Sequence, residues 1–318
     1  AAILVVEQPS MAVRAYLGSV DIGDAKRYGH VDMINAVRSP GSTLKPFLYG
    51  MALDEGLIHS ESLLQDVPRR YGDYRPGNFA AGFSGAVSTS EALATSLNLP
   101  AVQLLEAYGP KRFAGELRSA GVPLLLPPLA EPNLALILGG AGSRLEELVS
   151  GYSAFARGGM AARLRLQPQD GLHERRLLSP GAAWIVRRIL SGQARPDRDP
   201  RAQLVQRPSL AWKTGTSYGF RDAWAIGVAP RYLIGIWIGR PDGTPVSGQF
   251  GLASAAPLGT TTSPLAASIA STTDSVEGGR TPNRPCTGRA YTPRPTLKSS
   301  PSLVKRVSVW SMAARVPR

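Results

Sequence analysis

The feature that most constrains the fold is a change of hydrophobic period along the chain. Residues 2–19 contain two alternating runs, AILVVE and MAVRAYLG, joined by turn residues at 8–10, and they predict a β-hairpin. Apolar residues then recur at helical spacing between 42 and 192, and three aromatic and β-branched runs between 210 and 239 predict strands again. An antiparallel sheet of about five strands, built from both ends of the chain and flanked by the intervening helices, is an α+β architecture.

Composition fits a folded body and argues against several classes of protein. With 318 residues and 43% apolar side chains, the chain can bury one large core or two smaller ones. Its one cysteine excludes an internal disulfide, and none of its three histidines lies in a nucleophile-elbow or zinc-helix motif. We therefore expect neither a metal nor a cofactor. The apolar runs NLALILGGAG and YLIGIWIG are too short to span a bilayer, which takes about 20 residues.

The net charge of +13 is concentrated towards the C-terminal end of the sequence. Residues 259–318 hold nine Lys or Arg against two Asp or Glu, a net of +7, which leaves +6 for residues 1–258. Because those 258 residues contain no clustered basic stripe with interleaved aromatic residues, we expect no nucleic-acid partner. The last 60 residues also include 18 Ser or Thr and 7 Pro without a sustained period, so we expect a disordered basic tail there.

The stretch RSPGSTLKPFLYG places a serine and a lysine three residues apart at the start of a predicted helix. Ser42 and Lys45 share one face there, so the amine can reach the hydroxyl. A serine becomes a nucleophile when a base takes its proton, and a lysine can be that base when burial or a second cation lowers its pKa. The spacing alone is weak support, because Ser302 and Lys305 repeat it in the predicted tail.

Two further motifs accompany the first. KTGT at 213–216 lies on a predicted strand, where the glycine would let a substrate backbone lie close and the lysine and threonine side chains would grip a carboxylate. SLN at 96–98 lies at a junction of two helices, where a hydroxyl could relay a proton and an amide could hold a peptide carbonyl. Taken alone, Ser96 and Asn98 fit the role of helix caps, and Lys213 fits a solvated strand lysine.

In the order Ser-x-x-Lys, Ser-x-Asn and Lys-Thr-Gly, the three motifs resemble the signature of penicillin-binding proteins and serine β-lactamases. The blocks YRPGNF, GAVSTSEALATSLNLPAVQL, LGGAGSRLEELVSGYSAFARGG and WKTGTSYGFRDAWAIG extend the resemblance over about residues 1–258. They look like the transpeptidase domain of class A penicillin-binding proteins, and most like the 1C type. This resemblance implies a β-lactamase/transpeptidase-like fold for residues 1–258.

The resemblance also implies a role for each catalytic residue. Ser42 is the nucleophile that accepts the acyl group, and Lys45 is its base. Ser96 passes a proton to the leaving group, and Asn98 holds the peptide bond of the substrate. Lys213 provides the charge that depresses the pKa of Lys45.

The same resemblance assigns substrate binding to the strand motif. Thr214 and Thr216 bind the terminal carboxylate, and Gly215 leaves room for the substrate backbone. The backbone N–H groups of Ser42 and Thr216 form the oxyanion hole. The implied donor is a peptidoglycan stem peptide ending in D-Ala-D-Ala, the acceptor is an amine on a neighbouring stem, and β-lactams acylate the serine as mimics of the donor.

Alternatives to a D,D-transpeptidase remain at this point. A D,D-carboxypeptidase or β-lactamase would hand the acyl group to water, and a β-lactamase of class A needs a second carboxylate for this, usually in Glu-x-x-Leu-Asn. The nearest approach, EPNL at 131–134, lacks that asparagine. A non-enzymatic β-lactam sensor or an inactive remnant is the other reading.

The resemblance stops near Leu258, although the family continues with a helix that packs on the sheet. We expect a change of reading frame or a misassembly there; the alternative is a native tail that binds acidic wall polymers or a membrane surface. The chain starts without methionine and inside an apolar alternation. We therefore expect an N-terminally truncated fragment of a bifunctional protein. The resemblance implies a membrane anchor and a peptidoglycan glycosyltransferase domain upstream, at the periplasmic face of the bacterial inner membrane.

Overall fold

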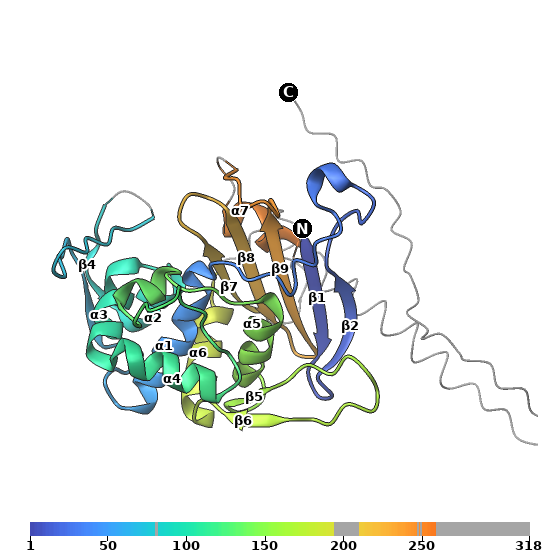
Figure 1. Cartoon of the computed structure of the whole chain (residues 1–318). Helices are drawn as coiled ribbons and strands as arrows, with labels where there is room; N and C mark the ends of the chain where they lie inside the picture. Colours follow the sequence, from blue (N-terminus) through green and yellow to red (C-terminus); the bar gives the residue numbers. More distant parts are fainter. Residues whose placement is uncertain (80–81, 194–209, 247, 249, 259–318) are drawn as a thin grey trace, which may run out of the picture. The chain divides into compact units, whose positions relative to one another are not determined.

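A single antiparallel sheet joins the two ends of the described chain. The structure is a computed structural model that describes residues 1–79, 82–193, 210–246, 248 and 250–258. The predicted tail at 259–318, with its Ser302 and Lys305 pair, lies outside these residues. The strand order is β2-β1-β9-β8-β7, as Figure 1 shows, and it confirms the predicted five-stranded sheet. The strands are β1 (Ala2–Glu7), β2 (Ala12–Leu17), β7 (Ala211–Thr216), β8 (Asp222–Val228) and β9 (Tyr232–Gly239).

The centre of the sheet is buried on both faces. Every residue of β8 is buried, and six of the eight residues of β9 are. Such strands read as continuous apolar runs rather than as alternating ones. Strand β1 pairs with β9, with Val5 opposite Ile234, so the pairing between the two chain ends lies in the core of the molecule. Strand β7 lies at the edge and carries the KTGT motif.

Helices from the middle of the chain cover one face of this sheet (Figure 1). Helix α1 packs at the centre, since eight of its ten residues are buried, as expected for a helix that is apolar on all sides. The α-helices of this layer are α1 (Lys45–Asp54), α2 (Thr89–Ala94), α3 (Asn98–Tyr108), α4 (Pro110–Ser119), α5 (Leu145–Tyr152) and α6 (Pro180–Ser191). Short 3-10 turns are η1 (Ala25–Arg27), η2 (Gly41–Leu44), η3 (Leu134–Leu138) and η4 (Ser153–Phe155).

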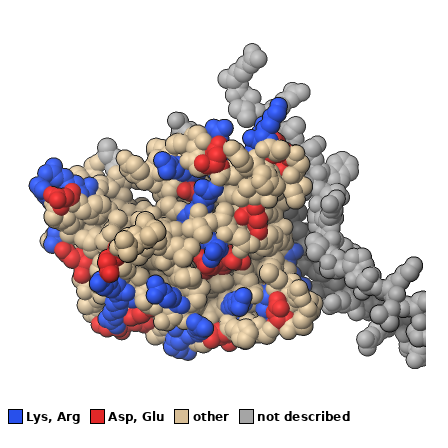
Figure 2. Space-filling view, in the orientation of Figure 1, with Lys and Arg blue, Asp and Glu red and all other residues tan. Residues whose placement is uncertain are grey.

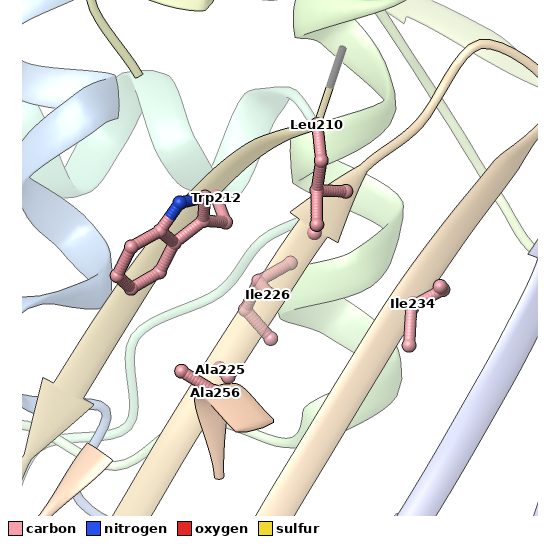
Figure 3. Close-up of a pocket in the computed structure, with 7 residues that line it drawn as sticks. Leu210, Trp212, Ala225, Ile226, Ile234 and Ala256 are labelled. Atoms are coloured by element: carbon pink, nitrogen blue, oxygen red, sulfur yellow. The ribbon is translucent and has the colours of Figure 1, made fainter. Parts of the chain in front are cut away.

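The opposite face of the sheet meets a short helix, α7 (Gly251–Ser254), and the two alanines that follow it. This is an apolar contact, because Ala255 and Ala256 pack with side chains of β7, β8 and β9. Figure 3 shows a small cavity on this side of β8, where Ala256 lies next to Ala225. Among the described residues, no helix combines the length and the apolar character that a membrane crossing requires.

Two short ribbons were not foreseen from the sequence. Strands β3 (Leu63–Asp66) and β4 (Gly85–Ser88) pair with each other, as do β5 (Met160–Ala162) and β6 (Glu174–Arg176). Three or four residues are too few to establish a hydrophobic period. On the surface, Figure 2 shows Lys and Arg interspersed with Asp and Glu over the described residues of the face in view.

Candidate active site

The nucleophile candidate lies in a 3-10 turn that leads directly into α1. The backbone N–H of Lys45 donates to the carbonyl of Ser42, which is the i to i+3 bond of such a turn. Residues three apart are eclipsed in this geometry, so Ser42 and Lys45 lie on the same face, as the sequence predicted. Pro46 follows in the first turn of α1, where a missing N–H breaks no hydrogen bond.

Glycines allow this turn to lie close to β7 and to the end of η3. A Cβ atom on Gly41 would lie 2.5 Å from the carbonyl oxygen of Thr216, and one on Gly215 would lie 2.4 Å from the carbonyl oxygen of Pro40. A Cβ atom on Gly139 would lie 2.9 Å from the backbone nitrogen of Gly41. The sequence suggested that Gly215 admits a substrate backbone. In the structure, the close approach at Gly215 is made by the segment that carries the nucleophile.

Hydrogen bonds from three other elements hold the nucleophile turn in place. The indole N–H of Trp224 on β8 donates to the carbonyl of Ser39 at 2.8 Å, and the Ser39 hydroxyl donates to the carbonyl of Gly139 at 2.8 Å. The buried hydroxyl of Tyr152 on α5 donates to the carbonyl of Thr43 at 2.7 Å. The position of the serine is therefore set by the sheet and by two segments of the helical layer.

The two lysines of the motifs converge on the SLN segment. The Lys213 amine donates to the Ser96 hydroxyl at 2.7 Å and to the Thr214 carbonyl at 2.9 Å. The Lys45 amine lies 3.4 Å from the same hydroxyl. Its closest acceptors are the carbonyl oxygen of Ser96 (2.7 Å), the carbonyl oxygen of Leu97 (3.0 Å) and Oδ1 of Asn98 (2.7 Å). These three bonds hold the Lys45 amine against the SLN segment. Within the described chain, the Ser42 hydroxyl has no hydrogen-bond partner.

Burial depresses the pKa of both lysines. Lys45 is fully buried and Lys213 is 2% exposed, so a charged amine loses its hydration at either position. This desolvation lowers the pKa of Lys213 to about 7. For Lys45, desolvation and then the positive charge of Lys213 lower the pKa well below the usual lysine value. A neutral amine that can accept a proton is therefore accessible to this pair near neutral pH.

Ser96 holds its place at the expense of backbone strain. It follows α2 in a left-handed conformation, with φ of 62°. The N–H of Ser96 donates to Leu93 and the N–H of Leu97 donates to Ala92, which is the hydrogen-bond pattern of a Schellman motif. Glycine is the usual residue at this position, and another residue there costs about 1 kcal/mol. A glycine at this position would lack the hydroxyl that Lys213 contacts.

The threonines of the strand motif share one face of β7, since side chains alternate along a strand. Thr214 and Thr216 are both partly exposed, whereas Lys213 and Gly215 are buried. The N–H of Gly251 donates to the Thr216 hydroxyl oxygen at 3.1 Å. That oxygen already accepts a hydrogen bond, so its own proton remains available to a carboxylate.

The carboxylate that a class A β-lactamase would need is not part of this cluster. Glu131 forms an ion pair with Lys111 at 2.7 Å, and both side chains are more than 70% exposed. Asn133 accepts a hydrogen bond from the backbone N–H of Ala135, at the start of η3. Among the described residues, no carboxylate lies within hydrogen-bond distance of the two motif lysines or of Ser96.

Sequence reasoning assigned no role to the YRPGNF block, yet three of its residues, Gly77, Asn78 and Phe79, lie at the site. The side chain of Asn78 accepts a hydrogen bond from the backbone N–H of Asn98. The ring of Phe79 lies 5.9 Å from the ring of Phe220, in the β7–β8 turn, and 5.7 Å from the ring of Phe250. The segment between β3 and β4 therefore contacts both the SLN side and the KTGT side of the site. The resemblance of the YRPGNF block to the family was the signal in the sequence that could have indicated these residues. The residue types and spacing of the block do not by themselves predict a catalytic or binding role.

Known proteins are similar to this chain in sequence and in fold. Residues 2–123 match the family model described as the penicillin binding protein transpeptidase domain. The chain is 66% identical to penicillin-binding protein 1C of Escherichia coli over 257 residues, which cover 81% of this chain and 33% of that protein. It is 28% identical to penicillin-binding protein 1A of Neisseria gonorrhoeae over 262 residues, covering 75% of this chain and 32% of that protein.

Solved structures of the same fold are also similar. The PonA1 protein of Mycobacterium tuberculosis, in complex with penicillin V, matches with a TM-score of 0.64 and 21% identity, over 89% of this chain and 79% of that one. Penicillin-binding protein 1A of Haemophilus influenzae matches with a TM-score of 0.68 and 20% identity, over 90% of this chain and 48% of that one. The α+β prediction and the β-lactamase-like fold are confirmed.

These features place the chain in a class of protein, the penicillin-binding transpeptidase domains. They are the fold, the serine-lysine motif and the two lysines that converge on Ser96. The chain belongs to the penicillin-binding protein transpeptidase family, as its resemblance predicted. It spans about a third of the length of the curated relatives that it matches.

Proposed function

We propose that this chain is the catalytic domain of a peptidoglycan D,D-transpeptidase with Ser42 as nucleophile. The observation that carries the proposal is the buried contact of Lys45, Ser96 and Lys213 beside the turn that bears Ser42, with no carboxylate among the hydrogen-bond partners of those three residues within the described chain. Such a cluster can move a proton between a serine and a leaving amine, and it lacks the second carboxylate with which a class A β-lactamase activates water.

In the first half of the reaction, the Ser42 oxygen attacks the carbonyl carbon of the penultimate D-Ala of a stem peptide. The neutral Lys45 amine takes the serine proton, and the backbone N–H groups of Ser42 and Thr216 bind the oxyanion. The peptide C–N bond breaks, and the departing D-Ala amine receives a proton from the Ser96 hydroxyl. That hydroxyl recovers a proton from the lysine pair, since it lies 3.4 Å from the Lys45 amine and 2.7 Å from the Lys213 amine.

In the second half, an amine on a neighbouring stem replaces D-alanine. It attacks the ester carbonyl, gives a proton back through Ser96 and Lys45 to the Ser42 oxygen, and leaves as the new peptide cross-link. In the first half, the terminal carboxylate of the donor binds at Thr214 and Thr216 and then departs with D-alanine. In both halves, Asn98 donates to the substrate carbonyl. Asn98 Nδ2 has a second hydrogen for this purpose, because only one is used in the hydrogen bond to Gly77.

The larger setting follows from the family. We propose that peptidoglycan stems and β-lactams are the ligands of this site, and that the chain acts at the periplasmic face of a bacterial inner membrane. In this proposal it is part of a longer bifunctional protein with a membrane anchor and a peptidoglycan glycosyltransferase domain. The length of the relatives, about three times the matched region, supports this proposal.

A fluorescent penicillin tests the nucleophile. We expect one covalent band with the unmodified chain, the same band with Ser302→Ala, and none with Ser42→Ala. Labelling that persists without Ser42, or a folded chain that never labels, would refute the proposal. A stem-peptide mimic incubated with a D-amino acid then tests the reaction type: an exchanged peptide indicates transfer, whereas hydrolysis products alone or penicillin turnover indicate a carboxypeptidase or a β-lactamase.

A further inference from the structure

Asn78 lies in the segment between β3 and β4 and is hydrogen-bonded on both sides of its side-chain amide. Its Oδ1 accepts from the backbone N–H of Asn98 at 3.0 Å. Its Nδ2 donates to Oδ1 of Asp66 at 2.8 Å and to the carbonyl of Gly82 at 3.2 Å. The other carboxylate oxygen of Asp66 accepts from the N–H of Ser84 at 2.8 Å. These bonds connect a buried carboxylate to the first residue of α3.

The carboxylate of Asp66 fixes which way the amide of Asn78 points. Asp66 is fully buried, and both of its oxygens serve as acceptors. The NH2 group of Asn78 must therefore face Asp66, and the amide oxygen must face Asn98. Without Asp66, the NH2 group would keep, among the described residues, the longer hydrogen bond to the carbonyl of Gly82 at 3.2 Å. Asp66 thus sets the polarity of the contact with the SLN segment.

The N-terminus of α3 depends on this contact. Asn98 is the first residue of the helix, and the side chain of Leu97 before it offers no acceptor for the free N–H groups. Asn78 supplies the acceptor from another part of the chain. The adjacent carbonyl of Gly77 accepts from Nδ2 of Asn98 at 2.7 Å. Both the main chain and the side chain of Asn98 are therefore held by residues 77–78.

We propose that Asn78 is a positioning residue that aims the SLN segment at Lys45. Three acceptors of the Lys45 amine come from this segment, and one of them is Oδ1 of Asn98 at 2.7 Å. Ser96 in the same segment is strained, so it needs neighbours that hold it. The inference rests on the acyl-transfer function proposed above and adds Asn78, with Asp66 behind it, to the groups that the reaction requires.

The direct test compares three variants in the rate of acylation by a fluorescent penicillin. Asn78→Ala removes the acceptor for the N–H of Asn98, and we expect acylation to slow by about 10²-fold, as for other small displacements of catalytic groups. Asn78→Asp keeps an acceptor but places two carboxylates against each other, and we expect a comparable loss. The double variant Asp66→Asn with Asn78→Asp restores a donor opposite an acceptor, so we expect it to regain at least tenfold over Asn78→Asp.

Asn133→Ala is the matched control, because Asn133 also accepts a hydrogen bond from the backbone at a helix start, but its own side chain is exposed. All rates are measured at a temperature at which circular dichroism shows each variant folded. A purely structural role for Asn78 would lower the melting temperature and leave the acylation rate of the folded protein unchanged, and that result would overturn the proposal. Should Asn78→Ala fail to fold, the comparison of Asn78→Asp with the double variant decides: equal rates overturn the proposal.

The unmodified chain separates the two proposals. If it is not acylated at Ser42, the proposed function fails. If it is acylated at Ser42 but folded Asn78→Ala and Asn78→Asp react at the same rate, the proposed function stands and only the positioning role of Asn78 fails.

Discussion

Both faces of the five-stranded sheet bury apolar side chains, but they differ in their polar groups. The face towards α1 carries a buried polar cluster in which Lys45, Ser96 and Lys213 are joined by hydrogen bonds. The opposite face, next to α7, is an apolar cluster around a cavity of about 10 Å³. There the indole N–H of Trp212 is buried and, within the described chain, has no hydrogen-bond partner.

This difference predicts what a substitution on each face does. The polar cluster of Lys45, Ser96 and Lys213 depends on the placement of individual atoms, so a change within it should alter the chemistry more than the stability. The apolar face depends mainly on the area that it removes from water, so a change there should alter the stability more than the chemistry. The predictions below test this separation, beginning with the largest expected effect.

Removing the amine of Lys45 should give the largest effect. Lys45→Met keeps a long side chain in the buried site but leaves no base for Ser42, so we expect acylation to fall by about 10²- to 10⁴-fold. Single-turnover kinetics with a fluorescent penicillin measures the loss. Lys111→Met, on an exposed ion pair with Glu131, is the control and should react at the normal rate. A Lys45→Met protein that reacts normally would show that another group is the base.

Truncating the apolar face should change stability alone. Ile234 is 1% exposed in the cluster beneath α7, and Ile234→Ala should lower the free energy of unfolding by about 2–5 kcal/mol. Urea unfolding measures this change, and Leu166→Ala, at a side chain that is 63% exposed, provides the control. We expect the acylation rate of the folded Ile234→Ala protein to be unchanged. A tenfold loss of acylation would show that the two faces are coupled.

Lys213, the buried lysine on β7, should make the free energy of unfolding depend on pH. The pKa of Lys213 is about 7 in the folded chain, against 10.5 for an ordinary lysine. Between these values the unfolded chain binds one more proton than the folded chain, so the free energy of unfolding should rise with pH, by up to about 1 kcal/mol per pH unit. Lys45 adds to this rise, because its pKa is also lowered.

Urea unfolding at several pH values between 7 and 10 measures that slope. Lys213→Met should flatten it, whereas Lys111→Met should not. An unchanged slope in Lys213→Met would mean that the pKa of Lys213 is not lowered by folding. The rise in the free energy of unfolding should end near pH 10. Burial raises the pKa of the Tyr49 hydroxyl, so above pH 10 the folded chain keeps a proton that the unfolded chain loses. The free energy of unfolding then falls as the pH rises further.

The sequence predicted the elements that carry a local period. The first two strands are visible as alternation and the last three as aromatic and β-branched runs. The helices that begin at Lys45, Thr89 and Pro180 are visible as helical spacing, a capping serine or a proline in the first turn. The resemblance assigned Ser96 and Lys213 to one site, because three short motifs in a fixed order indicate one family, but it predicted no contact between them. No period or spacing in the sequence indicates that the Lys213 amine donates to the Ser96 hydroxyl at 2.7 Å.

Contacts between distant segments could not be predicted in the same way. Asn78 lies 20 residues before Asn98, and nothing in the spacing of PGNF and SLN signals a hydrogen bond between them. The direction of the Lys45 amine was also not foreseen, since a helical spacing of three shows only that it shares a face with Ser42. Gly215 illustrates a third case: a glycine indicates close approach, but the sequence does not say which backbone approaches.

The smallest expected effect is a difference in stability between two variants of Ser96. Ser96→Ala and Ser96→Gly both remove the hydroxyl that Lys213 contacts, so both should lose most of the acylation activity. Only glycine relieves the strain at φ of 62°, and we therefore expect Ser96→Gly to be about 1 kcal/mol more stable than Ser96→Ala in urea unfolding. Equal stabilities would show that the left-handed conformation costs nothing here. The expected difference would mean that the polar cluster keeps a residue that destabilises the fold because its hydroxyl serves the chemistry.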